Sequence, residues 1–265
     1  MSCSVVVATS GLRPDQLAAL RAALDAQAEP PGGYEVVIVE DVERRGPAAA
    51  RNEGVARARG ELIAFTDDDC EPDPGWLVAL VARWRGRREV GVGGTLVNEL
   101  RRNRFAVASQ LVHDTAHAWA NRGREPRFFA SNNLALPRAA LLDVGGFDEA
   151  LRFAEDRELC DRWVARGLAL EHEPGALVRH AHRMHAREFL AQHAGYGRGA
   201  WRFRVAQAAS GRPPAPIEPA FYDRLFREAA RSSAGTAALV VASQLANAAG
   251  FATAAVADRS RLPRP

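Results

Sequence analysis

The chain has 265 residues, of which 47% are apolar and 25% are charged, as in ordinary soluble globular proteins. These values exclude collagen-like, disordered and disulfide-stapled classes. All 35 basic residues are arginine and the net charge is +3. Because no continuous basic patch with interleaved aromatic side chains is found, no nucleic-acid partner is expected. Cys3, Cys70 and Cys160 lack metal-ligand spacing and are typical of free thiols in a reducing compartment.

The first seventy or so residues alternate between apolar runs and helical patterns. Ser4–Thr9, Tyr34–Glu40 and Glu61–Thr66 are rich in β-branched residues and predict buried strands. A helical pattern opening at Pro14 and an Ala-rich pattern over Pro47–Arg59 predict the helices between them. This β-α-β-α-β order predicts an α/β fold with a doubly wound, mostly parallel sheet.

The rest of the chain continues the alternation of strands and helices. Helices are expected at Pro74–Arg85, Phe105–Ala120 and Glu155–Arg166, and strands at Val90–Val97, Phe128–Leu136, Leu168–His172 and Ala176–His180. A Pro-rich stretch over Pro213–Pro219 is the only clear boundary. It predicts a main domain over residues 1–212, followed by a linker and a C-terminal helical tail over residues 213–265.

Polar residues follow each of the first three predicted strands. They are Thr9 and Ser10 after the first strand, Glu40 and Asp41 after the second, and Asp67–Asp69 after the third. Because ligands bind at the carboxyl ends of the strands in open α/β sheets, these residues should converge on one crevice.

Seven segments in order resemble family 2 of the inverting nucleotide-sugar glycosyltransferases, which have the GT-A fold. The segments are Val5–Ser10, Val37–Asp41, Gly46–Asn52, Ala64–Asp69, Ser131–Leu134, Gly145–Glu149 and Glu155–Leu159. The chain departs from the family in a short Asp41–Gly46 segment and in Glu40-Asp41, where the family usually has two aspartates.

The resemblance implies a GT-A catalytic domain with C-terminal helices and transfer of a sugar from a nucleotide-sugar donor to an acceptor hydroxyl. UDP- and dTDP-sugars are the favoured donors. A role in cell-envelope glycan, glycolipid or secondary-metabolite synthesis is expected. Two alternatives stay open, namely a catalytically inactive nucleotide-sugar-binding protein and a nucleotidyltransferase.

Asp67-Asp68-Asp69 is the candidate metal motif, since carboxylate oxygens are preferred by hard divalent cations. The resemblance implies Mg²⁺ or Mn²⁺ as cofactor, with Asp69 on the metal, Asp67 on the ribose side and Asp68 able to exchange roles with either. The alternative is a solvated acidic turn. His180 is implied as the second metal ligand, with His182 as the competing choice and surface histidines as the other interpretation.

Asp156 lies in the first turn of a predicted helix, where a carboxylate is stabilised as the anion. The resemblance implies that Asp156 is the general base and that Glu155 is its neighbour on the acceptor side. A simple helix-start role is the alternative. The residues implied in donor binding are Thr9, Ser10, Asp41, Arg51, Asp67, Asp68, Asn132 and Asn133. Structural roles compete for Asp41 as a cap and for both asparagines as turn residues.

The segment Ser232–Ala257 is uncharged and long enough to cross a bilayer. Three alternatives are considered in this order: a packed amphipathic helix, association with a membrane surface, and a true span. The expected location is cytoplasmic, with peripheral contact to the inner face of the membrane as a variant, and no signal peptide is recognised. The stretch Tyr196–Gly199 either borders the diphosphate or breaks a helix.

Overall fold

The computed structural model describes residues 2–214 and 216–259, so residues 1, 215 and 260–265 lie outside the described residues. Contacts divide the chain into two units. Unit 1 comprises Met1–Glu99, Ala120–Ala150 and Asp156–His182, and unit 2 comprises Leu100–Trp119, Leu151–Glu155 and Arg183–Pro265. The domain boundary predicted at residue 212 stays a prediction.

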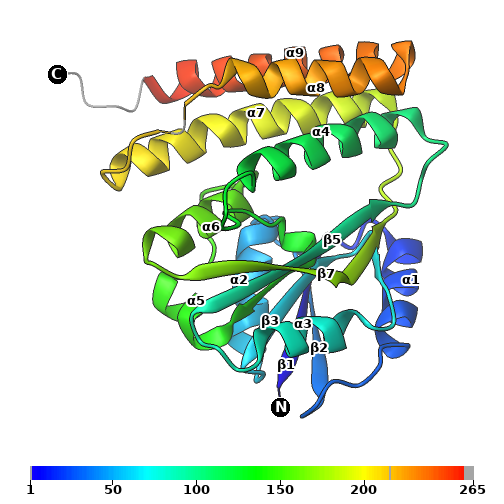
Figure 1. Ribbon diagram of the computed structural model, residues 1–265, viewed down its shortest axis with the longest axis vertical. Helices are drawn as coiled ribbons and strands as arrows, with labels where there is room; N and C mark the ends of the chain where they lie inside the picture. The colour runs from blue at the N-terminus through cyan, green and yellow to red at the C-terminus, as the bar shows by residue number, and fades with distance from the viewer. Residues whose placement is uncertain (1, 215, 260–265) are drawn as a thin grey trace. The chain divides into compact units, whose positions relative to one another are not determined.

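Unit 1 is built on a sheet with the strand order β2-β1-β3-β6-β5-β7-β4 (Figure 1). The strands are β1 (Cys3–Thr9), β2 (Tyr34–Glu40), β3 (Leu62–Asp67), β4 (Cys70–Pro72), β5 (Val90–Asn98), β6 (Leu134–Pro137) and β7 (Ala169–His180). β1 pairs in parallel with β2 and β3, and β5 pairs in parallel with β7. β6 and β4 pair with their neighbours in antiparallel fashion. The predicted doubly wound α/β fold is confirmed.

Helices cover both faces of this sheet. They are α1 (Pro14–Asp25), α2 (Pro47–Arg57), α3 (Trp76–Trp84), α5 (Arg138–Val144) and α6 (Glu155–Ala165). Alternate residues of β1 face opposite sides. Val5 and Val7 therefore belong to one core cluster with α1 and α3, while Val6 belongs to the other with α2, α5 and α6. The central strands are buried on both faces, which explains their continuous apolar sequence.

Three expected strands differ from the observed ones. The strand predicted over Phe128–Leu136 was wrong in extent, because a 3₁₀ turn, η1 (Ser131–Asn133), precedes the short β6. The two strands predicted between residues 168 and 180 form the single strand β7. β7 stays paired with β5 through a register shift between Gly93 and Thr95. The short strand β4 was not predicted, since its three residues carry no periodic signal.

Unit 2 is helical and contains α4 (Arg104–Ala120), α7 (Ala186–Ala209), α8 (Pro219–Ser232) and α9 (Ala234–Arg259). The backbones of α7 and α9 approach closely. A Cβ atom at Gly197 would lie 1.9 Å from the Asn247 carbonyl oxygen, and one at Gly250 would lie 1.9 Å from the Ala194 carbonyl oxygen. Of the two alternatives for Tyr196–Gly199, the helix break is wrong, because α7 is continuous and Gly197 permits the approach of α9. A position bordering the diphosphate stays a prediction.

α9 is not sorted into an apolar inner face and a polar outer face, although Val240 is fully buried in the core of unit 2. Its polar residues Thr236 and Ser243 are buried, whereas Val241, Leu245 and Val256 are 46%, 68% and 69% exposed. The buried Ser243 hydroxyl donates to the Val240 carbonyl at 2.7 Å, which satisfies it within the helix. Among the described residues, the stretch Ala234–Asp258 is one helix whose length and composition would suit a membrane span, although core helices also meet these criteria.

His193 is a buried polar residue of α7 in unit 2. Its side chain is packed against Phe189 and Tyr196, with ring centroids 4.5 Å and 5.4 Å away. Within residues 2–214 and 216–259, neither of its ring nitrogens has a hydrogen-bond partner. Burial lowers the pKa of His193 to about 4, because the charged imidazolium would lose its hydration.

We expect His193→Phe to make the protein less sensitive to acid. The unfolded chain protonates this histidine below its ordinary pKa of 6.5, whereas the folded chain does so only near pH 4. The folded state therefore loses stability as the pH falls through this window, by about 2 kcal/mol at pH 5. Thermal unfolding at pH 7.5 and pH 5.0 checks this. An equal drop in Tm for the variant and the natural chain would contradict it.

Candidate active site

Three consecutive carboxylates begin at Asp67, the last residue of β3, and side chains from several segments bond to them. Asp67 Oδ1 accepts a hydrogen bond from Arg51 Nη2 of α2 at 2.7 Å. Asp68 Oδ2 accepts one from the Thr9 hydroxyl at the end of β1 at 2.6 Å. Burial raises the pKa of Asp68, and the bond from Thr9 opposes this rise. The acidic run is thus partly buried and bonded, in contrast to a solvated turn.

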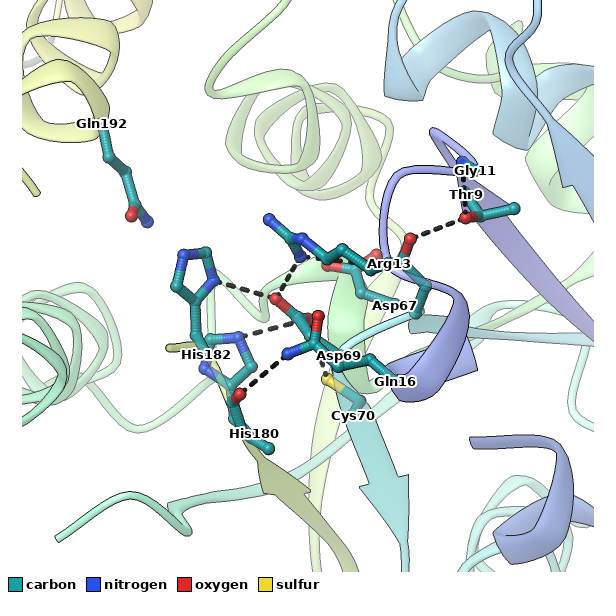
Figure 2. A network of polar contacts seen from close by, with 12 residues as sticks. Thr9, Gly11, Arg13, Gln16, Asp67, Asp69, Cys70, His180, His182 and Gln192 are labelled. Atoms are coloured by element: carbon teal, nitrogen blue, oxygen red, sulfur yellow. Dashed lines mark hydrogen bonds and ion pairs between the residues drawn. The ribbon is translucent and has the colours of Figure 1, made fainter. Parts of the chain in front are cut away.

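Asp69 is 4% exposed and lies where donors from two distant segments meet (Figure 2). Its Oδ2 lies 2.5 Å from Arg13 Nη1 and 2.9 Å from His182 Nδ1, and its Oδ1 lies 3.4 Å from His180 Nε2. Burial by itself would raise the pKa of Asp69. The two histidine contacts and the charge of Arg13 nevertheless hold this pKa well below its ordinary value. Asp69 is therefore an anion.

The donor set around Asp69 fits a divalent cation. The ligand atoms of Asp69, Cys70 and His180 all lie within 4.8 Å of one another. Cys70 is paired directly opposite His180 between β4 and β7. Burial raises the pKa of the Cys70 thiol well above its ordinary value, so this group keeps its proton. A carboxylate with imidazole nitrogens suits Mn²⁺ and, through the carboxylate, Mg²⁺.

Asp156 lies near the start of α6 and is partly exposed. Its Oδ2 accepts a hydrogen bond from the Ser131 backbone N–H at 3.2 Å, and its Oδ1 accepts one from the Arg157 N–H at 2.7 Å. Burial raises the pKa of Asp156, although the charge of Arg51 opposes the shift. The carboxylate therefore takes up a proton more readily than an exposed aspartate. Glu155, the first residue of α6, is buried.

The remaining donor-binding candidates take up different positions. Ser10 is exposed, whereas Arg51 is buried with its guanidinium 5.5 Å from the centroid of the Phe147 ring. Asp41 accepts hydrogen bonds from the backbone N–H groups of Arg45 at 2.8 Å and Gly46 at 2.7 Å. The capping role considered for Asp41 is thus present in the structure, and its contact with a base stays a prediction.

The two neighbouring asparagines of η1 differ in their bonding. The Asn133 side-chain oxygen accepts from the Trp76 indole N–H at 2.8 Å. The Asn133 side-chain nitrogen donates to the carbonyls of Thr95 at 3.0 Å and Ala176 at 2.9 Å. Asn133 thereby ties together α3, β5 and β7. The Asn132 side-chain oxygen is buried and has no partner among the described residues, so it can still accept a hydrogen bond.

Sequence reasoning missed two residues of this site. Arg13 follows the loop after β1, and its position directly before a helix start gave no sign that it would reach Asp69. Cys70 was dismissed on spacing along the chain, but the antiparallel pairing of β4 with β7 brings it to His180. The choice left open between His180 and His182 is not exclusive, because both reach the same carboxylate.

Comparison with known proteins gives the family. Residues 6–147, more than half of the chain, match the model of glycosyl transferase family 2. The chain therefore belongs to this family, as the motifs predicted.

Two curated relatives match this chain over longer stretches than the family model does. The chain is 31% identical over 170 residues to a pre-mycofactocin glycosyltransferase of Mycobacterium tuberculosis, covering 62% of this chain and 36% of the relative. It is 30% identical over 176 residues to the succinoglycan biosynthesis protein ExoU of Rhizobium meliloti, covering 63% and 50% respectively. The chain thus spans about a third to a half of the length of these relatives.

Solved structures share the architecture. The mannosyltransferase PcManGT from Pyrobaculum calidifontis, in complex with GDP-Man and Mn²⁺, matches with a TM-score of 0.59 at 19% identity, covering 99% of this chain and 76% of that one. TarS of S. aureus, in complex with UDP-GlcNAc, matches with a TM-score of 0.56 at 18% identity, covering 86% and 71%. At this identity the likeness establishes the fold, and the predicted GT-A fold is confirmed.

The contrast between the two asparagines gives a stability prediction. We expect Asn133→Ala to destabilise the protein by several kcal/mol, because it leaves buried partners unsatisfied at about 1–3 kcal/mol each. Asn132→Ala removes no side-chain oxygen bond, and we expect it to cost under about 1 kcal/mol. Urea unfolding of both variants beside the natural chain measures this difference. Equal destabilisation by the two substitutions would contradict the conclusion that the Asn133 side chain holds α3, β5 and β7 together.

Proposed function

We propose that this protein is a metal-dependent, inverting glycosyltransferase of the hexosyl-transferring kind. One observation carries the proposal: the Asp69 carboxylate, beside Asp67 and Asp68, meets His180 at the carboxyl ends of β3 and β7. Open α/β sheets bind their ligands at such strand ends. Family membership and an acidic–imidazole site at this edge together favour glycosyl transfer over nucleotidyl transfer.

The donor proposed is a nucleotide sugar, with UDP- and dTDP-sugars favoured. The relatives of known structure hold GDP-Man and UDP-GlcNAc, which supports the general class of donor. Thr9, Ser10, Asp41 and Arg51 are proposed to line the nucleoside, and Asp67 the ribose. Asn132 is proposed to bind the sugar, since its buried side-chain oxygen is available to a hydroxyl group. Asn133 is assigned here to holding the loop, because its side-chain bonds are already made.

The cofactor proposed is Mg²⁺ or Mn²⁺, held by Asp69 and His180, with His182 as a further ligand. When bound, the cation neutralises charge that builds up on the departing nucleotide diphosphate.

Asp156 is proposed as the general base. Its carboxylate removes the proton from the acceptor hydroxyl while that oxygen attacks the anomeric carbon. The bond from the anomeric carbon to the diphosphate breaks on the opposite face, so a single displacement inverts the anomeric configuration. The bonds from the Ser131 and Arg157 N–H groups hold the carboxylate in place. Glu155 is proposed to lie on the acceptor side.

A panel of UDP-, dTDP- and GDP-sugars tests the proposed reaction. Release of the nucleotide is followed with Mn²⁺ or Mg²⁺ and a set of hydroxyl acceptors. We expect turnover with at least one donor, its loss in EDTA and its recovery when Mn²⁺ is restored. Full turnover in EDTA would overturn the metal dependence. Donor binding without turnover on every acceptor would favour the binding-protein alternative.

We expect Asp156→Asn to cut transfer by roughly two to four orders of magnitude, because the amide accepts no proton from the attacking hydroxyl. The Kd for the nucleotide should stay within a few-fold of that of the natural chain. Since burial raises the pKa of Asp156, the natural enzyme should also lose rate on the acid side at a higher pH than an exposed aspartate would give. Steady-state kinetics against pH measures both effects.

Asp161→Asn, a substitution further along the same helix, is the matched control and should keep the transfer rate. The configuration of the product, read by NMR, should be opposite to that of the donor. Near-normal transfer by Asp156→Asn, or retained configuration, would refute the proposed mechanism.

We also propose that the protein is cytoplasmic and contacts the membrane surface through α9. The support is the outward apolar face of this helix, which includes Val241, Leu245 and Val256. We expect Leu245→Glu to reduce co-sedimentation with vesicles of phosphatidylcholine and phosphatidylglycerol several-fold, because it places a charge on that face. Leu142→Glu, at a residue of unit 1 that is 49% exposed, is the control. Equal sedimentation of both variants would exclude the exposed apolar residues of α9 as the surface that contacts the membrane.

A further inference from the structure

Four protein side chains contact the Asp69 carboxylate, and the two shortest contacts are both made to Oδ2. Oδ2 is met by Arg13 Nη1 at 2.5 Å and His182 Nδ1 at 2.9 Å. Oδ1 is met by His180 Nε2 at 3.4 Å and by the Cys70 thiol at 3.9 Å. A carboxylate oxygen has two lone pairs, and Arg13 and His182 occupy both of those on Oδ2. A cation that binds this oxygen must therefore displace Arg13 or His182.

Arg13 differs from the other three donors in charge and freedom. Its guanidinium is a permanent cation, which a divalent ion repels and cannot use as a ligand. Its side chain is 40% exposed, whereas those of His180 and His182 are 21% exposed. Its backbone is anchored just before α1, where the Arg13 carbonyl accepts the Leu17 N–H at 2.9 Å. The side chain can therefore swing away without moving the helix.

The guanidinium of Arg13 is also only partly used. Nη1 contacts both Asp69 and, at 3.3 Å, Asp68 Oδ1 (Figure 2). For Nη2 and Nε, the part of the chain that the structure describes provides no bonded partner. The planar guanidinium, whose fork of N–H donors suits phosphate oxygens, is thus bonded to the carboxylates through Nη1 alone among the described residues.

We propose that Arg13 is a displaceable counter-ion that couples binding of the divalent cation to binding of the nucleotide diphosphate. Without ligands, Arg13 neutralises Asp68 and Asp69 in the place where the cation's charge is needed. The diphosphate draws the guanidinium off the carboxylates, and the cation then replaces it. This inference rests on the proposed function. It adds Arg13 to the proposed site, and it explains why binding of the cation should depend on binding of the diphosphate.

The coupling has a consequence for each ligand alone. The cation by itself must compete with Arg13 for Asp69, so its affinity is low. When a diphosphate is present, the guanidinium has an alternative partner and that competition weakens. Because coupling between two ligands is reciprocal, the cation must tighten the diphosphate by the same factor. A residue that only supports the fold would alter neither affinity nor their coupling.

Binding of Mn²⁺ to Arg13→Gln tests the proposal without turnover. Free Mn²⁺ is measured by electron paramagnetic resonance during titration, alone and with saturating UDP or GDP. In the natural chain we expect the nucleotide to tighten Mn²⁺ binding by roughly 5- to 150-fold, the usual range for coupled ligands. In Arg13→Gln we expect Mn²⁺ alone to bind about tenfold more tightly, and the tightening by nucleotide to fall several-fold.

The variant should also gain more thermal stability from Mn²⁺ than the natural chain does, since it binds the ion more tightly. Arg13→Lys keeps the charge without the planar fork and should restore the weak binding of Mn²⁺ alone. Arg57→Gln removes an exposed arginine of α2 that is paired with Glu53, and it should behave as the natural chain. Asp69→Asn should abolish Mn²⁺ binding both without nucleotide and with UDP or GDP.

Two failures are distinguishable. If the natural chain binds Mn²⁺ with nucleotide but Arg13→Gln binds Mn²⁺ alone no more tightly, the counter-ion role is overturned and the proposed function stands. If the natural chain binds no Mn²⁺ with or without either nucleotide, the metal dependence and the role of Arg13 are overturned together. Circular dichroism confirms that each variant is folded before it is compared.

Discussion

The crowding of three carboxylates at the end of a buried strand is the constraint on which the site depends. Adjacent anions repel one another, and Asp68 and Asp69 are buried from water, so these carboxylates need compensation from the protein. The compensation comes from several segments: Arg51 of α2 for Asp67, and Thr9 of β1 for Asp68. Arg13 contacts both Asp68 and Asp69, and His180 and His182 at and after the end of β7 contact Asp69. The acidic run thereby fixes the surrounding segments relative to one another within unit 1.

The sheet beneath the site contains a junction between two sets of parallel strands. β6 joins the parallel strands β1–β3 to the pair β5 and β7 through antiparallel pairings, and η1 leads into it. The Asn133 side chain closes this junction by bonding Trp76 and the carbonyls of Thr95 and Ala176. Trp76 is itself fully buried, so its indole N–H needs this partner. Asn133 therefore has a structural role, since its side chain holds the backbone of β5 and β7 in place.

Unit 2 follows a different packing rule. Gly197 and Gly250 let the backbones of α7 and α9 approach closely, and Phe251 of α9 packs on Trp201 of α7 with ring centroids 5.3 Å apart. Val240 of α9 is buried, while Val241, Leu245 and Val256 are exposed. Small residues at helix contacts are a packing mode also used by helices in membranes. Hydroxyl groups such as that of Ser243 remain satisfied because they bond within their own helix.

The amino-acid sequence by itself determined the elements around β1–β3 and the order of the family motifs. The apolar runs of β1–β3 and the polar residues that end them are local signals, and they place Asp67–Asp69 at the strand ends. Contacts between distant segments carry no such local signal. Only the tertiary structure decided that Arg13 and both histidines share the Asp69 carboxylate, and that the Asn133 side chain is bonded while the Asn132 side-chain oxygen has no partner among the described residues. It also decided which apolar side chains of α9 are exposed, because the helices packed against α9 cover Val240 but leave Val241, Leu245 and Val256 at the surface.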